Sequence, residues 1–288
     1  MGFGGGLHQT DGEADDVETA PDSDQEGVPA ISVSDLRKVY GSEDSAVHAL
    51  DGVSFDIEPG TAVGILGPNG AGKTTLIKSI LSLIVPSDGR VRVHGRNVYE
   101  HPRWAFRHMG AMFEGARNTY WRLTVRENLE MFSVIGGHDY RDRGDRLDEL
   151  LETFDLEEKA DTVVRELSRG QKQKVTLSCT MARDADIVFL DEPTLGLDVE
   201  SSRTLRTELT RLAREEGLTI FVSSHNMNVI EDVCDRVIVM SAGRIVADGT
   251  VEELLRGADR NAVRITSADI DEHLVRRLAQ HRGARVVV

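Results

Sequence analysis

The sequence predicts an α/β fold built on a largely parallel sheet. Short apolar strands alternate with helices over most of the chain, which is the pattern of consecutive βαβ units. One strand runs directly into a glycine-rich turn, and another ends in two adjacent acids, Asp191 and Glu192. Because ligands bind at the carboxyl ends of the strands in such sheets, these two places are the first candidates for a site.

The first half of the fold begins with two strands on either side of a polar turn at 41–44, since both flanks are rich in apolar and branched residues. A short apolar strand then leads into the glycine-rich turn, and a helix and a hairpin follow. We expect these strands at 31–39, 47–57 and 61–66, the helix at 73–83 and the hairpin at 90–98.

The second half alternates helices with buried strands. Apolar residues at helical spacing, among them Leu147, Leu150, Leu151 and Phe154, predict amphipathic helices in its first part. The run that ends in the acid pair is a buried strand, and the last two strands surround a turn at 241–243. We expect helices at 125–135, 141–151, 169–185 and 200–216, and strands at 187–190, 219–223, 236–240 and 244–248.

The two ends of the chain differ from this pattern. Residues 1–30 hold eight acids and no Lys or Arg, out of a net charge of −15, so we expect a disordered, solvated acidic tail. After about Gly257 the pattern starts again, with strand-like runs at 263–265 and 284–288 around a helical run at 270–279. We expect 257–288 to be a small accessory region, and both a natural end and an incomplete second domain fit this pattern.

The composition is acidic and poor in lysine, since only six of the 34 basic residues are lysines. Carboxylates keep a protein soluble at high salt, so this composition favours a salt-loving source; high-GC coding, which favours Arg, is the alternative. The negative charge also argues against non-specific nucleic-acid binding, because a phosphate backbone attracts basic surfaces.

The chain is expected to be cytosolic. No apolar run approaches the ~20 residues that cross a bilayer, and the N-terminus lacks the basic and apolar regions of a secretion signal. Cys179 and Cys234, each expected inside a helix, are interpreted as buried thiols in a reducing compartment. Any work at a membrane would therefore need a partner.

The glycine-rich turn fits the phosphate-binding pattern G-x-x-x-x-G-K-S/T. Glycines let the backbone wrap with its N–H groups pointing inward, so that phosphate oxygens lie in a nest. Lys73 adds positive charge for the β- and γ-oxygens, Thr74 offers a hydroxyl to Mg²⁺, and Thr75 lies near the α-phosphate. A plain surface turn is disfavoured by the strand before it and the helix after it. The cradle comprises Gly67, Pro68, Asn69, Gly70, Ala71, Gly72, Lys73 and Thr74.

The acid pair suits two different roles. Asp191 can hold Mg²⁺, through water, and Glu192 can orient the attacking water or accept its proton, because adjacent residues point to opposite sides of a strand. His225 follows the neighbouring strand, where a neutral imidazole could bond a γ-phosphate oxygen and hold the water. A solvated strand end and a surface histidine are the plain alternatives. The other eight histidines show no metal-ligand spacing, and none is assigned a role.

A second anion site is predicted where the segment LSRGQKQKV, residues 167–175, begins a helix. The first N–H groups of a helix lack intrahelical partners, and the macrodipole places partial positive charge there. A small polar residue, Ser168, and a glycine, Gly170, open this helix. Which anion the helix would hold, and on which molecule, does not follow from these residues alone.

Together these motifs resemble the ATP-binding cassette (ABC) family of transporter ATPases, over about residues 31–256. The resemblance implies a P-loop NTPase fold with a β-subdomain, a parallel-sheet core and a helical subdomain at about 116–166. It also implies Mg²⁺-dependent hydrolysis of ATP. The motifs look like Walker A at 67–74, the signature sequence at 167–171, Walker B at 187–191 with Glu192 as catalytic glutamate, the D-loop ending at Asp198, the switch histidine His225, and the adenine-stacking aromatic Tyr40.

The resemblance answers the question of the second anion. In the family, the signature helix of one subunit covers the γ-phosphate held by the other subunit. Ser168, the N–H of Gly170 and neighbouring Gln171 are therefore expected to contact ATP on a partner chain, in a homodimer or with a paired ABC subunit. The partner of that dimer would be a transmembrane permease, so the chain would lie on the cytoplasmic face of the membrane.

Two residues depart from the family pattern. Arg169 stands where the signature usually has glycine; its side chain is expected to point away from the phosphate, and a second positive contact to the phosphate is the alternative. Glu114 stands where the family usually has a glutamine that binds Mg²⁺; a carboxylate still offers oxygen, but it adds negative charge near the γ-phosphate.

The expected direction of transport is export. Residues 114–129 resemble the corresponding segment of drug-, antibiotic- and polysaccharide-efflux exporters, and Tyr120 and Trp121 are either contact aromatics or caps on the subdomain's own core. An importer, or a soluble ABC ATPase without a transport role, is the alternative. A pure binding module is disfavoured because Lys73 and Glu192 are both present.

Overall fold

The computed structural model describes residues 27–41, 45–113, 118–224 and 227–254. The predicted acidic tail up to residue 26, the accessory region 257–288, Glu114 and His225 lie outside the described residues. None of the helices in the described part is both long and apolar enough to span a membrane.

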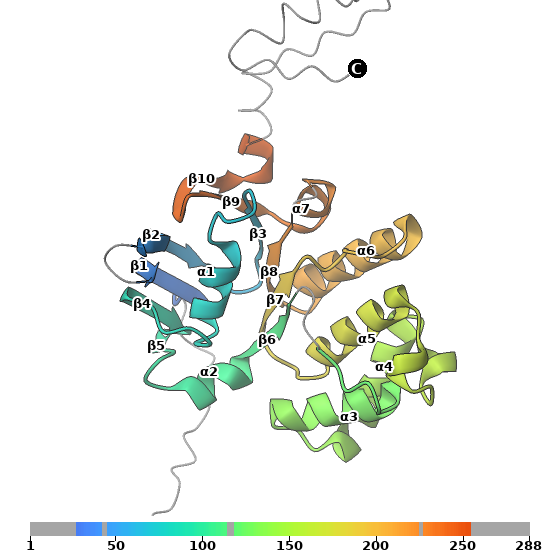
Figure 1. Ribbon diagram of the computed structural model, residues 1–288. Coiled ribbons are helices and arrows are strands. Elements are labelled where there is room, and N and C mark those ends of the chain that lie inside the picture. The colour runs from blue at the N-terminus through green and yellow to red at the C-terminus, as the bar shows by residue number, and fades with distance from the viewer. Residues whose placement is uncertain (1–26, 42–44, 114–117, 225–226, 255–288) are drawn as a thin grey trace, which may run out of the picture.

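Two sheets form the framework (Figure 1). The first is antiparallel, with strand order β2-β1-β4-β5, and it comprises β1 (Ile31–Tyr40), β2 (Val47–Ile57), β4 (Asp88–Val93) and β5 (Arg96–Asn97). The second has the order β10-β9-β3-β8-β7-β6 and is parallel except for β10. Its strands are β3 (Ala62–Leu66), β6 (Met109–Met112), β7 (Ile187–Asp191), β8 (Thr219–Ser223), β9 (Arg236–Ser241) and β10 (Arg244–Thr250).

Helices cover both faces of the parallel sheet. Figure 1 shows α1 between the two sheets and the remaining long helices on the other side. The helices are α1 (Lys73–Ile80), α2 (Pro102–His108), α3 (Val125–Gly136), α4 (Gly144–Thr153), α5 (Arg169–Met181), α6 (Val199–Glu215) and α7 (Met227–Val233). Short 3-10 helices occur at Tyr140–Arg143, Glu157–Lys159 and Val164–Glu166.

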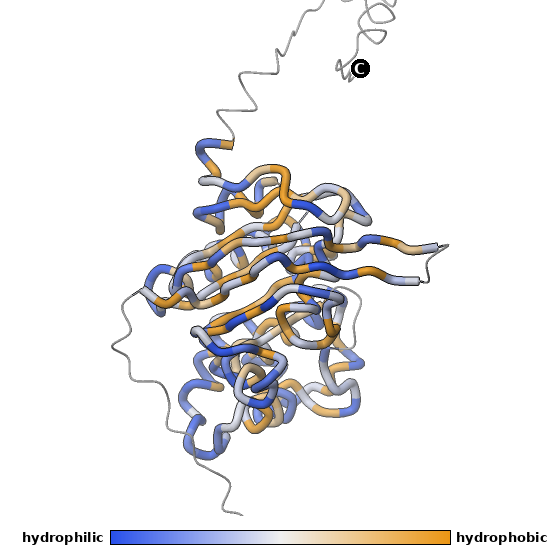
Figure 2. Tube along the Cα trace, turned by 90° about the vertical axis from the view of Figure 1, so that its left-hand side faces the viewer, coloured by the Kyte–Doolittle hydropathy of each residue, from blue (hydrophilic) through white to orange (hydrophobic). Residues whose placement is uncertain are grey.

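The alternation of side chains along the central strands creates two cores. On β7, Ile187 and Phe189 join the core against the antiparallel sheet and α1, whereas Val188 and Leu190 join the core under the helices. Phe221 of β8 packs against Phe189 with ring centroids 5.5 Å apart. Strands β7 and β8 are buried along their whole length, which is why they are continuous apolar runs in the sequence. Figure 2 looks onto the antiparallel sheet, whose strands instead mix hydrophobic and hydrophilic residues.

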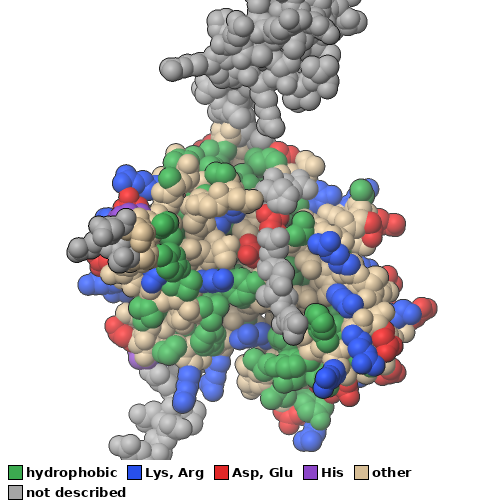
Figure 3. Space-filling view, in the orientation of Figure 1, with side chains coloured by type: hydrophobic (Ala, Val, Ile, Leu, Met, Phe, Trp, Pro, Cys, Tyr) green, Lys and Arg blue, Asp and Glu red, His purple; other side chains and the backbone are tan. Residues whose placement is uncertain are grey.

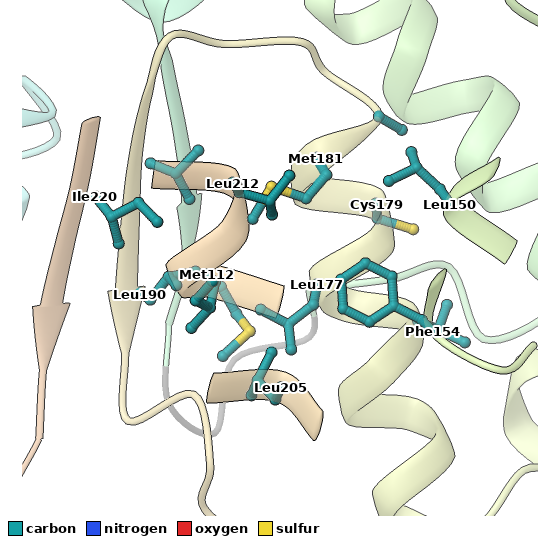
Figure 4. Packing of buried hydrophobic residues seen from close by; sticks show 14 of the residues in the cluster. Met112, Leu150, Phe154, Leu177, Cys179, Met181, Leu190, Leu205, Leu212 and Ile220 are labelled. Carbon is teal, nitrogen blue, oxygen red and sulfur yellow. The ribbon is translucent and has the colours of Figure 1, made fainter. Parts of the chain in front are cut away.

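Helix α5 joins the helical subdomain to the sheet. Leu177 and Met181, one turn apart, point toward β7 and α6, whereas Cys179 points the other way, toward Leu150 and Phe154 (Figure 4). All five side chains are buried. Because both faces of α5 are packed, the position of its first residue is fixed relative to the sheet.

The predicted fold class is confirmed, and most predicted elements are present, with differences at their ends. The first predicted helix ends at Ile80, and Ser82 turns the chain with φ +53°; the helix that starts at Arg169 ends at Met181. Helix α2 and strand β6 were not predicted, because a seven-residue helix and a four-residue strand are too short to show a period.

Both cysteines are buried, but only one lies inside a helix. Cys179 is on α5, and Cys234 directly follows α7, which corrects the expectation for Cys234. Burial raises the pKa of the Cys179 thiol and raises that of Cys234 to about 12. Both thiols therefore stay protonated and serve as small apolar groups in the core.

Candidate nucleotide-binding site

The glycine-rich loop lies between β3 and α1 and is pressed against two other strands. A Cβ on Gly67 would lie 2.4 Å from the carbonyl oxygen of Met240, and one on Gly72 would lie 2.4 Å from that of Ala49. Gly72 also has φ +103°, where only glycine is free of strain. The loop therefore needs glycine at these two positions for its path as well as for its N–H groups.

Lys73 folds across the loop that precedes it. Its Nζ donates to the carbonyl oxygens of Gly67, at 2.7 Å, and Pro68, at 3.2 Å. Phosphate oxygens bound in the loop would take the place of these two acceptors. Thr74 follows in the first turn of α1 and is exposed, and Thr75 is half-buried. The loop thus presents a cation, a hydroxyl and helix N–H groups on one side, as a triphosphate requires.

The acid pair is positioned by the pairing of β7 with β8. Asp191 lies opposite Ser223, whose Oγ donates to its Oδ1, and only 7% of Asp191 is exposed. The N–H of Glu192 donates to the carbonyl oxygen of Ser223 at 3.0 Å, and Ser224 Oγ lies 3.4 Å from Glu192 Oε2. Ser223, which the sequence did not single out, thereby holds both acids.

Glu192 has an unusual backbone conformation. Its φ of +53° lies in the left-handed region, which costs a residue with a side chain about 1–2 kcal/mol. Such strain is kept where a side chain must be aimed at a fixed point. The carboxylates of the two acids also have different neighbours, since Asp191 bonds Ser223 and Glu192 lies beside Ser224.

The start of α5 is organised by a capping box. Ser168 Oγ accepts from the N–H of Gln171 at 3.2 Å, and Gln171 Oε1 accepts from the N–H of Ser168 at 3.0 Å. Because Ser168 uses an oxygen lone pair in this bond, its hydroxyl hydrogen can still be donated to an anion. Gly170 lies in the first turn between them.

Arg169 lies against a loop of its own chain. A Cβ on Gly196 would lie 2.4 Å from Arg169 Nε, so the guanidinium stem packs on the D-loop-like segment 195–198. Asp198 caps α6, with Oδ1 accepting from the N–H of Ser201 at 2.8 Å and Oδ2 from its Oγ at 3.0 Å. The backbone bond from Ser201 lowers the pKa of Asp198 below its usual range.

A cavity of about 210 Å³ separates Glu192 from the start of α5. Gln173 lines it and donates from Nε2 to the carbonyl oxygen of Pro193 at 2.8 Å, which ties α5 to the turn after β7. The sequence did not identify Gln173 as a residue that positions α5, because a second glutamine in the segment 167–175 matches no motif. Asn118, on the same cavity, is bonded to the carbonyl oxygen of Phe113 at 2.8 Å.

Tyr40 lies at the same end of the molecule as the loop. It pairs with Val47, two residues from Ala49, whose carbonyl oxygen abuts Gly72. Its ring is 41% exposed, and Lys38 Nζ lies 5.1 Å from the ring centroid. A partly exposed aromatic ring at this edge can stack on a base.

The loop and the start of α5 lie on opposite sides of the sheet in one chain. Helix α1 packs in the core shared with the antiparallel sheet, and α5 packs in the core under the helices. Within the described residues, no hydrogen bond or ion pair links 168–171 to 67–75. The phosphate loop and residues 168–171 thus form two separate groups, each at the start of a helix, where N–H groups can face an anion.

A family model, related sequences and solved structures all indicate the same family for this chain. A family model described as "ABC transporter" matches residues 50–195. The chain is 36% identical over 224 residues to the ABC transporter ATP-binding protein NatA of Bacillus subtilis, covering 78% of this chain and 91% of NatA. It is also 36% identical over 230 residues to the methionine import ATP-binding protein MetN of Geobacillus kaustophilus, covering 78% and 67%.

Another relative, the probable multidrug ABC transporter ATP-binding protein YbhF of Escherichia coli, is 36% identical over 232 residues, covering 80% of this chain and 39% of YbhF. Among solved structures, a dimeric ATP-binding cassette in a post-hydrolysis state, bound to ADP and Pi, superposes with a TM-score of 0.70 at 26% identity, covering 77% of this chain and 98% of that one.

Two glycines of the loop, Gly70 and Gly72, provide a matched test of whether the loop packs tightly against β2. Gly70→Ala meets open space and should lower the free energy of unfolding only by the left-handed backbone cost at φ +81°, about 1–2 kcal/mol. Gly72→Ala adds a collision with Ala49 and should lower it further. Urea unfolding of both variants measures the difference, and equal losses would show that the loop is not pressed against β2.

Proposed function

Because the chain belongs to the ABC transporter family as an ATP-binding subunit with ATPase activity, we propose that it acts as one half of a dimer that closes around two ATP molecules to drive a membrane permease, in the direction of export. The second half is another copy of the chain or a paired ABC subunit. The dimer would work at the cytoplasmic face of the membrane, as a peripheral subunit of the transporter.

The separation of the two anion-binding groups carries the proposal. One chain holds the phosphate loop on one side of its sheet and the start of α5 on the other. Two copies related by a two-fold axis can place the start of each α5 on the loop of its partner, which completes both sites at once. The solved relative in its post-hydrolysis state is a dimer of this kind of cassette. This arrangement gives Ser168, Gly170 and Gln171 a ligand that their own chain does not offer.

Each residue group then has a task. The loop 67–75 would hold the phosphates, with Lys73 on the β- and γ-oxygens and Thr75 near the α-phosphate, and Tyr40 would stack on adenine. Glu192 would orient the attacking water and accept its proton, while the partner's signature helix stabilises the γ-phosphate. His225, outside the described residues, would hold the same water, and Asp198 would lie at the junction of the two chains.

The donor set suits Mg²⁺, the ion that accompanies ATP in such sites. The hydroxyl of Thr74 and the carboxylate of Asp191 offer the hard oxygen ligands that Mg²⁺ prefers, and Glu114 would add another. When bound, the ion neutralises charge on the β- and γ-phosphates. Asp191 is kept in place for this by Ser223, whose hydroxyl bonds one oxygen and leaves the other available.

Permease contact is supported by a hollow beside α3 that is lined by both polar and aromatic side chains. Asn118, Thr119, Tyr120, Trp121, Arg122 and Phe132 line a cavity of about 530 Å³. The space-filling view shows hydrophobic side chains gathered over this lower part of the helical subdomain (Figure 3). Tyr120 contacts Phe132 edge-on, with centroids 6.3 Å apart, yet remains 47% exposed, so it serves the subdomain and still offers a face to a partner.

Export is favoured by the resemblance of residues 114–129 to efflux cassettes and by the multidrug relative YbhF. An importer is the second candidate, because methionine import proteins match with the same identity as NatA. Transport by inside-out vesicles that carry the chain with its permease distinguishes the directions: an exporter loads such vesicles on addition of ATP, and an importer empties them.

Glu192→Gln should reduce ATP turnover by about 100-fold or more, because the amide cannot accept the proton of the attacking water. It should also trap a dimer with two bound ATP molecules on a sizing column. Glu200→Gln, on the exposed start of α6, is the control and should leave both turnover and association unchanged. A Glu192→Gln variant that stays monomeric and hydrolyses ATP at the wild-type rate would contradict the role proposed for Glu192.

Ser168→Ala separates helix capping from nucleotide contact. Thr124 opens α3 with the same kind of capping box, so Thr124→Ala loses an equivalent cap. Each substitution should lower the free energy of unfolding by about 1 kcal/mol. Only Ser168→Ala should also weaken ATP-driven dimerisation of the Glu192→Gln variant, measured by light scattering. If both caps weakened dimerisation equally, Ser168 would have no special contact with ATP.

Tyr120→Ser tests the permease surface. It should leave the basal ATPase rate of the isolated chain unchanged and weaken the binding of the co-purified permease by about tenfold, the usual loss at a central aromatic contact. Val134→Ser, on an exposed part of α3 outside the hollow, is the matched control. Equal permease affinity of the two variants, measured by pull-down titration, would place the contact elsewhere.

A further inference from the structure

Two histidines and an aspartate meet at the end of the parallel sheet that is opposite to the nucleotide site. His108 directly precedes β6 and Asp186 directly precedes β7, and these strands pair in parallel with Met109 opposite Ile187. The register therefore places residues 108 and 186 side by side. His94 comes from the turn between β4 and β5, where its φ is +44° and its N–H donates to the carbonyl oxygen of Ala30.

The donor atoms of the three side chains converge on one point. His108 Nδ1 lies 3.2 Å from Asp186 Oδ1, and His94 Nε2 forms a hydrogen bond with Asp186 Oδ2. One donor atom from each residue lies within 4.8 Å of the others. Donors around a tetrahedral Zn²⁺ are about 3.4 Å apart for bonds of about 2.0–2.1 Å. Small rotations of the side chains would bring all three onto one ion.

The surroundings fit a ligand set better than a sealed core. The side chains of His94, His108 and Asp186 are 22%, 27% and 47% exposed, so an ion and a water molecule can reach them. A carboxylate and two imidazoles are ligands that suit Zn²⁺ and related cations.

The two imidazole rings are held by an aromatic neighbour. Trp104, one turn before His108 on α2, lies with its ring centroid 4.3 Å from that of His108. The same ring meets His94 edge-on at 6.3 Å. Arg96 lies over Trp104, 4.9 Å from the ring centroid. Because this packing already restricts the rings, they lose less conformational entropy when they bind an ion.

We propose that His94, His108 and Asp186 form a binding site for a divalent transition-metal cation, with Zn²⁺ as the best match and water as its fourth ligand. The three ligands come from the antiparallel sheet, from the end of α2 and from the base of β7. A bound ion would tie the antiparallel sheet to the parallel one, far from the phosphate loop. The role is structural and independent of the proposed transport function.

The sequence does not predict this site, since the histidines other than His225 show no metal-ligand spacing in the sequence and none is assigned a role. Residues 94, 108 and 186 lie too far apart in the sequence to form a ligand motif. Strand register and the contact between the two sheets bring them together. A spacing rule detects ligands on one helix or one loop and misses ligands from three elements.

Zinc titration of the full chain tests the proposal. Calorimetry is carried out without nucleotide and in excess Mg²⁺, which fills sites built from oxygen alone. The wild-type chain should bind one equivalent of Zn²⁺, and Co²⁺ at the same site should give the visible bands of a four-coordinate ion. His94→Gln and Asp186→Asn should each lower Zn²⁺ affinity by at least about tenfold, the loss caused by removing even an outer-shell partner.

His101→Gln is the matched control, since His101 is an exposed histidine that precedes α2 and lies outside the cluster. It should bind Zn²⁺ like the wild type. Circular dichroism shows whether each variant is folded, and two independent variants guard against a failure of one. Absence of stoichiometric Zn²⁺ binding, or equal affinity in the cluster variants and the control, would overturn the proposal. The proposal would also fail if the wild-type chain bound no Zn²⁺ and the cluster variants were less stable than the wild type. The cluster would then act only as a hydrogen-bonded clamp.

Discussion

The parallel pairing of β7 with its two neighbours is the constraint on which the rest of the structure depends. Its register with β8 sets Asp191 opposite Ser223 and, through Ser223, fixes the turn at Glu192. Its register with β6 sets Asp186 beside His108 at the other end. A slip of one residue would send every side chain of β7 to the opposite core, so the packing of both cores enforces the register.

The two cores explain why the phosphate loop and the start of α5 lie on opposite sides of the sheet in one chain. The sheet lies between α1 and α5, because the two helices pack in different cores. Moving α5 toward the loop would expose Leu177 and Met181, which are packed against β7 and α6. Burial of side chains of this size stabilises the fold by about 1.5–3 kcal/mol each. The packing within one chain therefore opposes any rearrangement that would bring the start of α5 onto the phosphate loop.

Much of the fold and of the candidate site could be predicted from the sequence, because the motifs that indicate them are local. The cradle at 67–74, the acids after a buried strand and the capping residue Ser168 each carry their chemistry within a few positions. The short elements α2 and β6 lacked a period, and their absence from the prediction hid the neighbours of Asp186. Ser223 and Gln173 were missed for a related reason, since their importance lies in which strand or turn they face. Contacts between distant segments follow from register and layer packing, which one sequence does not state.

The length of β7 has a consequence for how its ends can influence each other. Asp186 and Asp191 are five residues apart on an extended strand, which spans roughly 17 Å. Because Asp191 is buried, solvent ions screen its charge only weakly, but the distance itself keeps the direct interaction between the two carboxylates small, about 1 kcal/mol at an effective dielectric constant of about 20. A stronger influence of one end on the other would have to travel as a displacement of the strand, which the two close-packed cores oppose.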